Sequence, residues 1–141
     1  MTDAFKLGRI NGAGNSVAIS ADPLRALAYN DCGLVYAGLG QFELAIADFN
    51  QVILLAPRFA SGYNNRGSAY REFGDIRKSI DDLARTIGLD PQFALAYYNR
   101  ALGHVLLEQD PEADRDAARA VALGSNSVRV QEAIARHRKL R

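Results

Sequence analysis

The sequence predicts an all-α fold in which helix-turn-helix units repeat and stack into a superhelix. The first observation is a period of 34 residues, which relates Gly33 to Gly67, Tyr36 to Tyr70, Gly40 to Gly74, Leu55 to Leu89, and Pro57 to Pro91. The second is that apolar residues within each period fall at helical spacing in two runs. One helix pair cannot bury its apolar face alone, so stacking of successive pairs is expected to form the core.

The first two units span residues 26–59 and 60–93. The first unit has its apolar positions at Tyr29, Tyr36, Leu39, Ala45, Phe49, Val52 and Ile53. Gly40-Gln41 and Gly74-Asp75 mark the turn between the two helices of each unit. Each unit ends at "APRF" or "DPQF", where proline cannot continue one helix but suits the start of the next. Each unit is therefore predicted to be two short helices.

The third unit, residues 94–127, keeps less of the pattern. Tyr97 and Ala101 follow the tyrosines and glycines of the earlier units, whereas His104 replaces a tyrosine and Ser125 replaces a proline. A small residue at the glycine position lets the paired helices approach closely, and the neighbouring tyrosine ring is expected to fill the space beside it. We predict a third helix pair here.

Residues 128–141 are predicted to form a capping helix with a basic end. Asn126 or Ser127 is the expected N-cap, and Val130 and Ile134 fall on one face. A repeat array needs a terminal element with one apolar and one polar face. The last turns carry the cations Arg136, Arg138, Lys139 and Arg141. These cations complement the negative end of a helix, and the alternative is that they bind an anion.

Residues 1–21 do not fit the repeat and are predicted to be an arm that is flexible or forms a hairpin. The segment contains Gly8, Gly12 and Gly14, which would weaken a helix, and Asp22-Pro23 is the expected start of the first one. Two roles are open: a tail without function, or a segment that covers the outer face of the first repeat or docks in a neighbouring molecule through Phe5, Leu7 and Ile10.

Composition excludes several functional classes. The 141 residues suffice for one domain with its own core. Lys and Arg number 17 and Asp and Glu 16, and a formal net charge of +1 gives no global field to attract nucleic acid or an anionic membrane. The single cysteine, Cys32, has no partner in the chain, and the sequence has neither a signal-peptide core nor a membrane-spanning apolar run. We expect a cytoplasmic protein.

The repeated positions resemble the tetratricopeptide repeat, a family whose 34-residue unit carries an aromatic residue, then Gly, Tyr, Ala, an aromatic residue and Pro. The first unit supplies Tyr29, Gly33, Tyr36, Gly40, Ala45, Phe49 and Pro57. The second supplies Tyr63, Gly67, Tyr70, Gly74, Leu83 and Pro91, with Ser79 in place of alanine, and the third keeps Tyr97, Ala101, Ala113, Ala117, Ala120 and Leu123. The resemblance implies a right-handed α-α superhelix of three helix-turn-helix repeats, within residues 22–127, plus the C-terminal capping helix.

The resemblance also implies a groove for a protein or peptide, lined by the first helices of successive units. The groove positions are Leu27, Asn30, Leu34, Asn64, Asn65, Ser68, Arg71, Leu95, Tyr98, Asn99, Leu102 and Val105. Asparagine and arginine donate hydrogen bonds to a peptide's carbonyls or carboxylate, while leucine and tyrosine offer apolar pockets. The expected ligand is therefore a short, partly apolar peptide or partner segment. Family members that grip a chaperone's C-terminal carboxylate use lysines and an arginine in this groove, and here those positions are Asn30, Leu34, Leu95 and Asn99. Only Asn65 of that clamp is kept.

Residues that carry catalytic or metal-binding chemistry form no active-site pattern. We interpret Cys32 as a packed thiol on the inner seam of its unit, where the other units have Arg66 and Arg100. His104 takes a core tyrosine position, and its hydrogen bond is expected to go to a neighbouring helix. No His or Cys cluster has metal-ligand spacing. We therefore expect no enzyme activity, no cofactor and no metal.

Acidic residues are interpreted as surface groups. The series Asp110, Glu112, Asp114 and Asp116 lacks the central glycine of a calcium loop and is expected at a helix N-terminus. Asp48, Asp81 and Asp82 are expected to face solvent from the second helices.

Two other functions are open at this point. In the first, the chain is a self-assembly scaffold, a homo-oligomer paired through the N-terminal arm or an exposed end repeat, and its size depends on concentration. In the second, residues 136–141 bind RNA or another polyanion, with an affinity that falls steeply with salt.

Overall fold

The computed structural model describes residues 22–141, and within that range it contains seven α-helices and no strand. The predicted arm, residues 1–21, lies outside the described residues. The helices are α1 (Pro23–Gly38), α2 (Phe42–Leu55), α3 (Ala60–Phe73), α4 (Ile76–Leu89), α5 (Ala94–Leu106), α6 (Asp110–Ala122) and α7 (Ser127–Arg138). The all-α fold predicted from the periodicity is confirmed.

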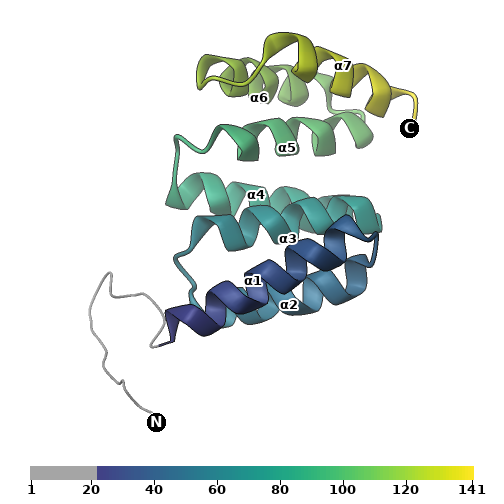
Figure 1. Cartoon of the computed structure of the whole chain (residues 1–141). Helices are drawn as coiled ribbons and strands as arrows, with labels where there is room; N and C mark the ends of the chain where they lie inside the picture. The colour runs from purple at the N-terminus through teal and green to yellow at the C-terminus, as the bar shows by residue number, and fades with distance from the viewer. Residues whose placement is uncertain (1–21) are drawn as a thin grey trace.

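Each predicted unit contains one helix pair. Helices α1 and α2, α3 and α4, and α5 and α6 pack most extensively, while α2 meets α3 and α4 meets α5 to join one pair to the next. Figure 1 shows the pairs stacked in chain order, with α1 and α2 at one end of the stack and α7 at the other. The first helices of the pairs, α1, α3 and α5, also contact one another in series, and α7 continues that series against α5.

Caps and glycine turns set the helix ends. The Asp22 side chain accepts a hydrogen bond from the Arg25 N–H (3.0 Å), and Pro23 opens α1. Asp75 and Asn126 cap α4 and α7 in the same way. The turns that follow α1 and α3 contain Gly40 (φ 76°) and Gly74 (φ 107°), left-handed conformations that favour glycine. The predicted helix starts at residues 22–23 and 126–127, and both glycine turns, are confirmed.

Glycine in the first helix of a unit permits close contact between the paired helices. A Cβ at Gly33 would lie 2.5 Å from the Phe49 ring, and a Cβ at Gly67 would lie 3.0 Å from Leu83. Side chains of the second helix lie directly at the glycine, and Tyr36, which was predicted to pack beside it, packs against the cluster that contains Phe49. Phe49 and Leu83 are fully buried as a result.

Helix α7 closes one end of the stack. Val130, Ala133 and Ile134 are buried and form one cluster with Leu102 and Val105 of α5. The predicted apolar face of the capping helix is confirmed. No helix in the described range 22–141 is long and apolar enough to cross a membrane.

Candidate functional site

A ladder of asparagine side chains joins the first helices of the three pairs. The Asn65 amide on α3 donates to Oδ1 of Asn30 on α1 (3.0 Å), and the Asn99 amide on α5 donates to Oδ1 of Asn64 on α3 (3.2 Å). Asn30, Asn64 and Asn99 are buried, whereas Asn65 is half-buried. The predicted groove asparagines are therefore brought together, but several of their hydrogen-bonding groups bind each other. We call the side of α1, α3 and α5 that carries this ladder the groove face.

Arg71 extends the ladder on α3 and is the least satisfied cation on the groove face. Its side chain is only 9% exposed, yet Nη1 lies 3.5 Å and 3.4 Å from the backbone and side-chain oxygens of Asn99, and Nη2 lies 3.4 Å from Glu72. These distances exceed those of a strong charge-assisted bond. Nε is buried and has no hydrogen-bond partner. Burial lowers the pKa of the Arg71 guanidinium, and the Glu72 carboxylate opposes that shift.

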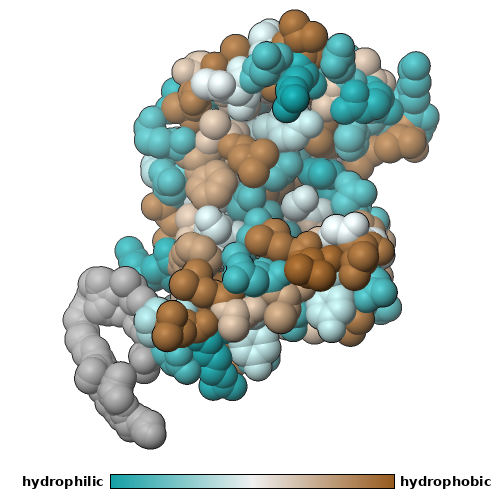
Figure 2. All heavy atoms as spheres, in the orientation of Figure 1, coloured by the Kyte–Doolittle hydropathy of each residue, from teal (hydrophilic) through white to brown (hydrophobic). Residues whose placement is uncertain are grey.

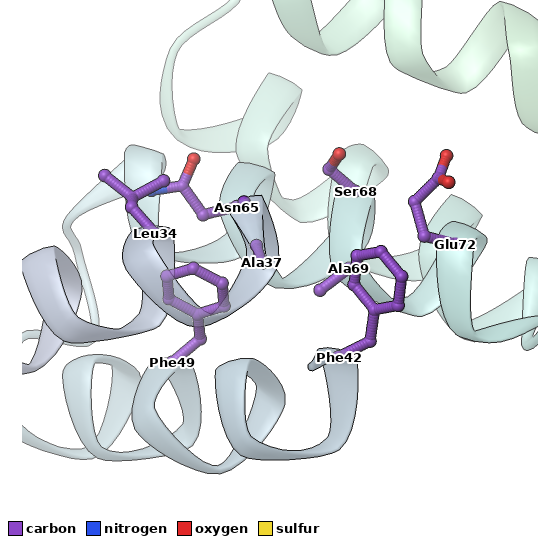
Figure 3. A pocket seen from close by; sticks show the side chains of 9 residues that line it. Leu34, Ala37, Phe42, Phe49, Asn65, Ser68, Ala69 and Glu72 are labelled. Atoms are coloured by element: carbon purple, nitrogen blue, oxygen red, sulfur yellow. The ribbon is translucent and has the colours of Figure 1, made fainter. Parts of the chain in front are cut away.

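A hollow of about 400 Å³ opens on the groove face between α1 and α3. Its walls are Leu34, Ala37 and Gly38 of α1, and Asn65, Ser68, Ala69 and Glu72 of α3, with Phe42 and Phe49 of α2. Figure 3 shows the two phenylalanine rings rising from α2 toward the space between the other two helices. The lining is apolar where the α2 rings form it and polar on the α3 side. This arrangement suits a ligand residue whose side chain is apolar and whose backbone binds polar groups.

The structure corrects part of the predicted groove. Leu102 and Val105 are 2% and 0% exposed, because α7 packs against α5 where the sequence pattern left a free surface. Tyr98 is half-buried against the same cluster. Leu27, Leu34 and Leu95 are about half exposed and stay available to a ligand, and Ser68 is half-buried in the wall of the hollow.

A second set of charged residues joins the two helices within a pair. Arg66 on α3 makes two hydrogen bonds of 2.8 Å to the Asp82 carboxylate on α4, and Arg100 on α5 makes the equivalent bonds of 2.7 and 2.9 Å to Asp116 on α6. Each carboxylate hydrogen bond raises the pKa of its guanidinium. Our prediction that Asp82 faces solvent was wrong, because the residue is buried in this pair.

The first pair lacks this arginine. Cys32 occupies the position and is exposed, so the prediction of a packed thiol was wrong. Asp48 stands where the other pairs have Asp82 and Asp116. Its Oδ2 atom is buried without a hydrogen-bond partner, and burial raises the pKa of the Asp48 carboxyl. Asp81 is exposed, as predicted.

The predictions for His104 and for the acidic series hold in part. His104 contacts Gln109 Oε1 through Nδ1 (2.7 Å) and Asp116 on α6 through Nε2 (3.5 Å). The acidic series begins α6, with Asp110 and Glu112 in the first turn. Its last member, Asp116, was also predicted to be a surface group, and that was wrong: it is buried in its pair with Arg100. Among residues 22–141 there is no group of three or more His, Cys, Asp or Glu side chains arranged to hold a metal ion.

Part of the basic C-terminal end is bound within the chain. Arg141 makes two hydrogen bonds to the Asp110 carboxylate, of 2.8 and 3.2 Å, and one of 2.9 Å to the Val105 carbonyl. Arg138 lies 3.8 Å from Asp110 and 4.0 Å from Asp114. The Arg141 hydrogen bond lowers the pKa of the Asp110 carboxyl. Two of the four cations proposed for polyanion binding are therefore engaged with carboxylates of α6.

Comparison with known proteins defines the class. A family model described as Tetratricopeptide repeat matches residues 26–59 and 60–93, the residues of the first two units. The chain is a tetratricopeptide repeat protein. No curated protein sequence matches it.

Solved structures of the same fold are similar over most of the chain. The first TPR of Spaghetti (RPAP3) bound to the HSP90 peptide SRMEEVD has a TM-score of 0.76 at 21% identity, over 83% of this chain and 93% of that chain. The TPR2B domain of yeast Sti1 in complex with pHsp70 has a TM-score of 0.76 at 22% identity, over 84% and 99%. The second TPR domain of human RPAP3 in complex with the HSP70 peptide SGPTIEEVD has a TM-score of 0.72 at 22% identity, over 81% and 95%. At these identities the likeness establishes the fold.

Sequence reasoning missed two features of the site. Phe42 and Glu72 line the hollow, and neither was predicted to do so. Phe42 comes from α2, and the period alone does not reveal that a second helix contributes to the groove face. The sequence did carry a signal for the unpaired Asp48. The period aligns Asp48 with Asp82 and Asp116, and it places Cys32 where the arginine partners of those two aspartates stand.

Proposed function

We propose that the chain is a protein-interaction module whose groove face binds a short extended segment carrying one acidic group and one apolar side chain. Arg71 is the observation that carries this proposal. Its side chain is nine-tenths buried, and its contacts of 3.4 to 3.5 Å leave the guanidinium weakly satisfied. Because arginine donates two parallel hydrogen bonds to a carboxylate, an acidic ligand group at the exposed edge of Arg71 would stabilise it.

The hollow between α1 and α3 is the proposed site for the apolar side chain. Leu34, Phe42 and Phe49 give it an apolar interior, while Asn65 and Ser68 offer hydrogen bonds to a peptide backbone beside it. A ligand side chain of the size of leucine or methionine would displace water from these rings.

The two subsites define the spacing of the ligand. The hollow lies between α1 and α3, and Arg71 reaches from α3 to Asn99 on α5. Packed helices lie about 8–10 Å apart, and an extended peptide advances about 3.3 Å per residue. The apolar and acidic groups of the ligand are therefore expected about three residues apart.

The similar structures support an acidic, partly apolar ligand. The peptides SRMEEVD and SGPTIEEVD combine glutamate and aspartate with an apolar Met or Ile. Of the residues that grip a chaperone's carboxyl terminus in this family, this chain keeps only Asn65. We therefore propose that Arg71, rather than a clamp on a terminal carboxylate, selects the acidic group.

Fluorescence polarisation with labelled peptides tests the proposal. The peptides carry Leu or Met three residues before Glu, and a matched set carries Gln instead of Glu. Arg71→Gln is expected to weaken binding of the Glu peptides about tenfold or more, and Ser68→Leu is expected to block the hollow. Arg77→Gln, which removes an exposed charge on α4, is the control. Equal binding by the Arg71 variant and the wild type, or equal binding of Glu and Gln peptides, contradicts the proposal.

Self-association is a second candidate because α1 presents an apolar outer face. Val35 is 61% exposed, whereas Ala69 and Gly103, at the equivalent positions of the other units, are buried. Leu39 is 66% exposed. Figure 2 shows hydrophobic side chains gathered along α1 at the front of the molecule. Light scattering over a wide concentration range tests this candidate with the full chain, the chain without residues 1–20, and a Val35→Glu variant. A dimer lost in the Val35 variant supports self-association, and a monomer at all concentrations contradicts it.

A further inference from the structure

The second and third helix pairs each contain the same binding site for a guanidinium group. In the second pair, the Asp82 carboxylate receives two hydrogen bonds from Arg66, whose guanidinium carbon lies 5.9 Å from the Tyr63 ring centroid and 5.7 Å from the Tyr70 ring centroid. In the third pair, Asp116 receives two hydrogen bonds from Arg100, whose guanidinium carbon lies 5.9 Å from the Tyr97 ring centroid, while His104 stands at the position of the second tyrosine. The site therefore consists of a carboxylate on the second helix and aromatic rings one turn away on the first.

The first helix pair keeps the parts of this site and lacks the arginine. Asp48 is the counterpart of Asp82, and Tyr29 and Tyr36 are the counterparts of the two tyrosines. Cys32 replaces the arginine, is exposed, and has a side chain too short to reach across as Arg66 does. We call the position in the first pair that corresponds to these sites, marked by Cys32, Asp48, Tyr29 and Tyr36, the notch.

The Asp48 carboxylate in the notch lacks a hydrogen-bond donor for one of its oxygens. Its Oδ2 atom is buried without a hydrogen-bond partner, in contrast to the doubly bonded Asp82. Arg25 lies near the notch, with its guanidinium carbon 5.9 Å from the Tyr29 ring centroid, but the hydrogen bonds of the described residues do not join it to Asp48. A buried carboxylate oxygen without a donor is costly, because it has given up water without gaining a partner.

We propose that the notch binds the guanidinium of an arginine side chain supplied by a partner protein. Both intact copies of the site hold an arginine through two parallel hydrogen bonds, so a guanidinium is the group that the notch is expected to bind. Arginine also stacks on aromatic rings, whereas lysine presents a point charge that cannot bind both carboxylate oxygens in parallel. The partner's arginine would complete the arrangement that Arg66 and Arg100 complete within the chain.

The notch is separate from the groove face. Cys32 is two residues from Asn30 along α1, which turns it about 200° around a helix with 3.6 residues per turn. A partner could therefore occupy the notch and the groove face at once. The proposal does not depend on the ligand of Arg71.

Nα-acetyl-arginine amide is the probe for the first test, with the neutral citrulline analogue and the lysine analogue as controls. Binding is followed by the NMR signal of the Asp48 side-chain carboxyl carbon and by the melting temperature. We expect saturation in the millimolar range, as befits a single side chain, for the wild type and for Cys32→Ser, which keeps the notch open. We expect no saturation with citrulline amide, and none for Asp48→Asn. Cys32→Arg, which fills the notch from within, is also expected to lose the response.

Three results would overturn the proposal. An equal response of Asp48→Asn and the wild type would place the probe elsewhere. A lysine amide as effective as the arginine amide would remove the selectivity for guanidinium. No saturable response in the wild type and in Cys32→Ser would mean that the notch binds no arginine. A cooperative melting transition of Cys32→Arg, at or above the melting temperature of the wild type, serves as the check that this variant is folded.

Discussion

Arg66 and Asp82 face each other across α3 and α4 and share two hydrogen bonds of 2.8 Å, an arrangement that recurs 34 residues later between Arg100 and Asp116. The recurrence makes the pair part of the repeat unit in this chain rather than a single surface contact. Its absence from the first unit provides an internal control for its contribution to stability.

Asp82→Asn is expected to lower the free energy of unfolding by roughly 1.5–3 kcal/mol, because it weakens two charge-assisted bonds in a mostly buried site. Asp48→Asn makes the same chemical change at a carboxylate that has no arginine partner, and it should cause no loss. Urea denaturation of the two variants measures the difference. Similar losses in both would show that the ion pair is not what stabilises the unit.

Cys32→Arg is expected to stabilise the chain by about 1 kcal/mol, because it supplies the missing donor to Asp48. The gain should vanish in the double variant with Asp48→Asn, since the coupling of the two positions resides in their hydrogen bonds. A gain that persists in the double variant would have to come from another contact of the new arginine.

Stability is expected to depend on pH in opposite ways at two aspartates. Burial raises the folded-state pKa of Asp48, so its contribution is present below the ordinary pKa of 3.8 and is lost as pH rises through the folded-state value. The Arg141 hydrogen bond lowers the pKa of Asp110, so its contribution is present above that ordinary value and is lost as pH falls through the folded-state pKa.

Denaturation of the wild type, Asp48→Asn and Asp110→Asn between pH 2.5 and 6, in about half-unit steps, measures both contributions. The stability of the wild type relative to Asp48→Asn should decline with rising pH, and relative to Asp110→Asn it should increase. A slope of the same sign for both variants would contradict the assignment.

Gly33→Ala is expected to cost roughly 1–3 kcal/mol, because the added Cβ would lie 2.5 Å from the Phe49 ring and the core must shift. Phe49→Leu in the same chain should relieve part of this overlap. Gly38→Ala is the matched control on the same helix: its Cβ meets nothing within 4 Å, so the change should be neutral or slightly stabilising. Thermal melting compares the three, and an equal effect at both glycines would show that helix propensity rather than packing decides the outcome.

The period of the sequence was enough to predict the helix pairs, since glycine, proline and capping residues act over a few positions. Gly74 and Asp75 illustrate this: the turn and the cap that follow α3 are both where local chemistry places them. Groove accessibility was predicted less well. Leu102 and Val105 fit the groove pattern of their own helix, but α7, more than 20 residues further along, covers them. Side chains contributed by a different element cannot be read from one helix's register.

Helix α7 gives the stack two unlike ends. Its buried side, with Val130 and Ile134, seals the third pair, and its outward positions include the exposed polar residues Arg129, Gln131 and Glu132. The α1 end presents Val35 and Leu39 instead. Head-to-tail growth into a fibre needs two complementary ends, so a molecule with a single adhesive end can only pair with its own kind about a two-fold axis. Association through α1 would therefore stop at two chains. The result would be a symmetric dimer that carries two groove faces.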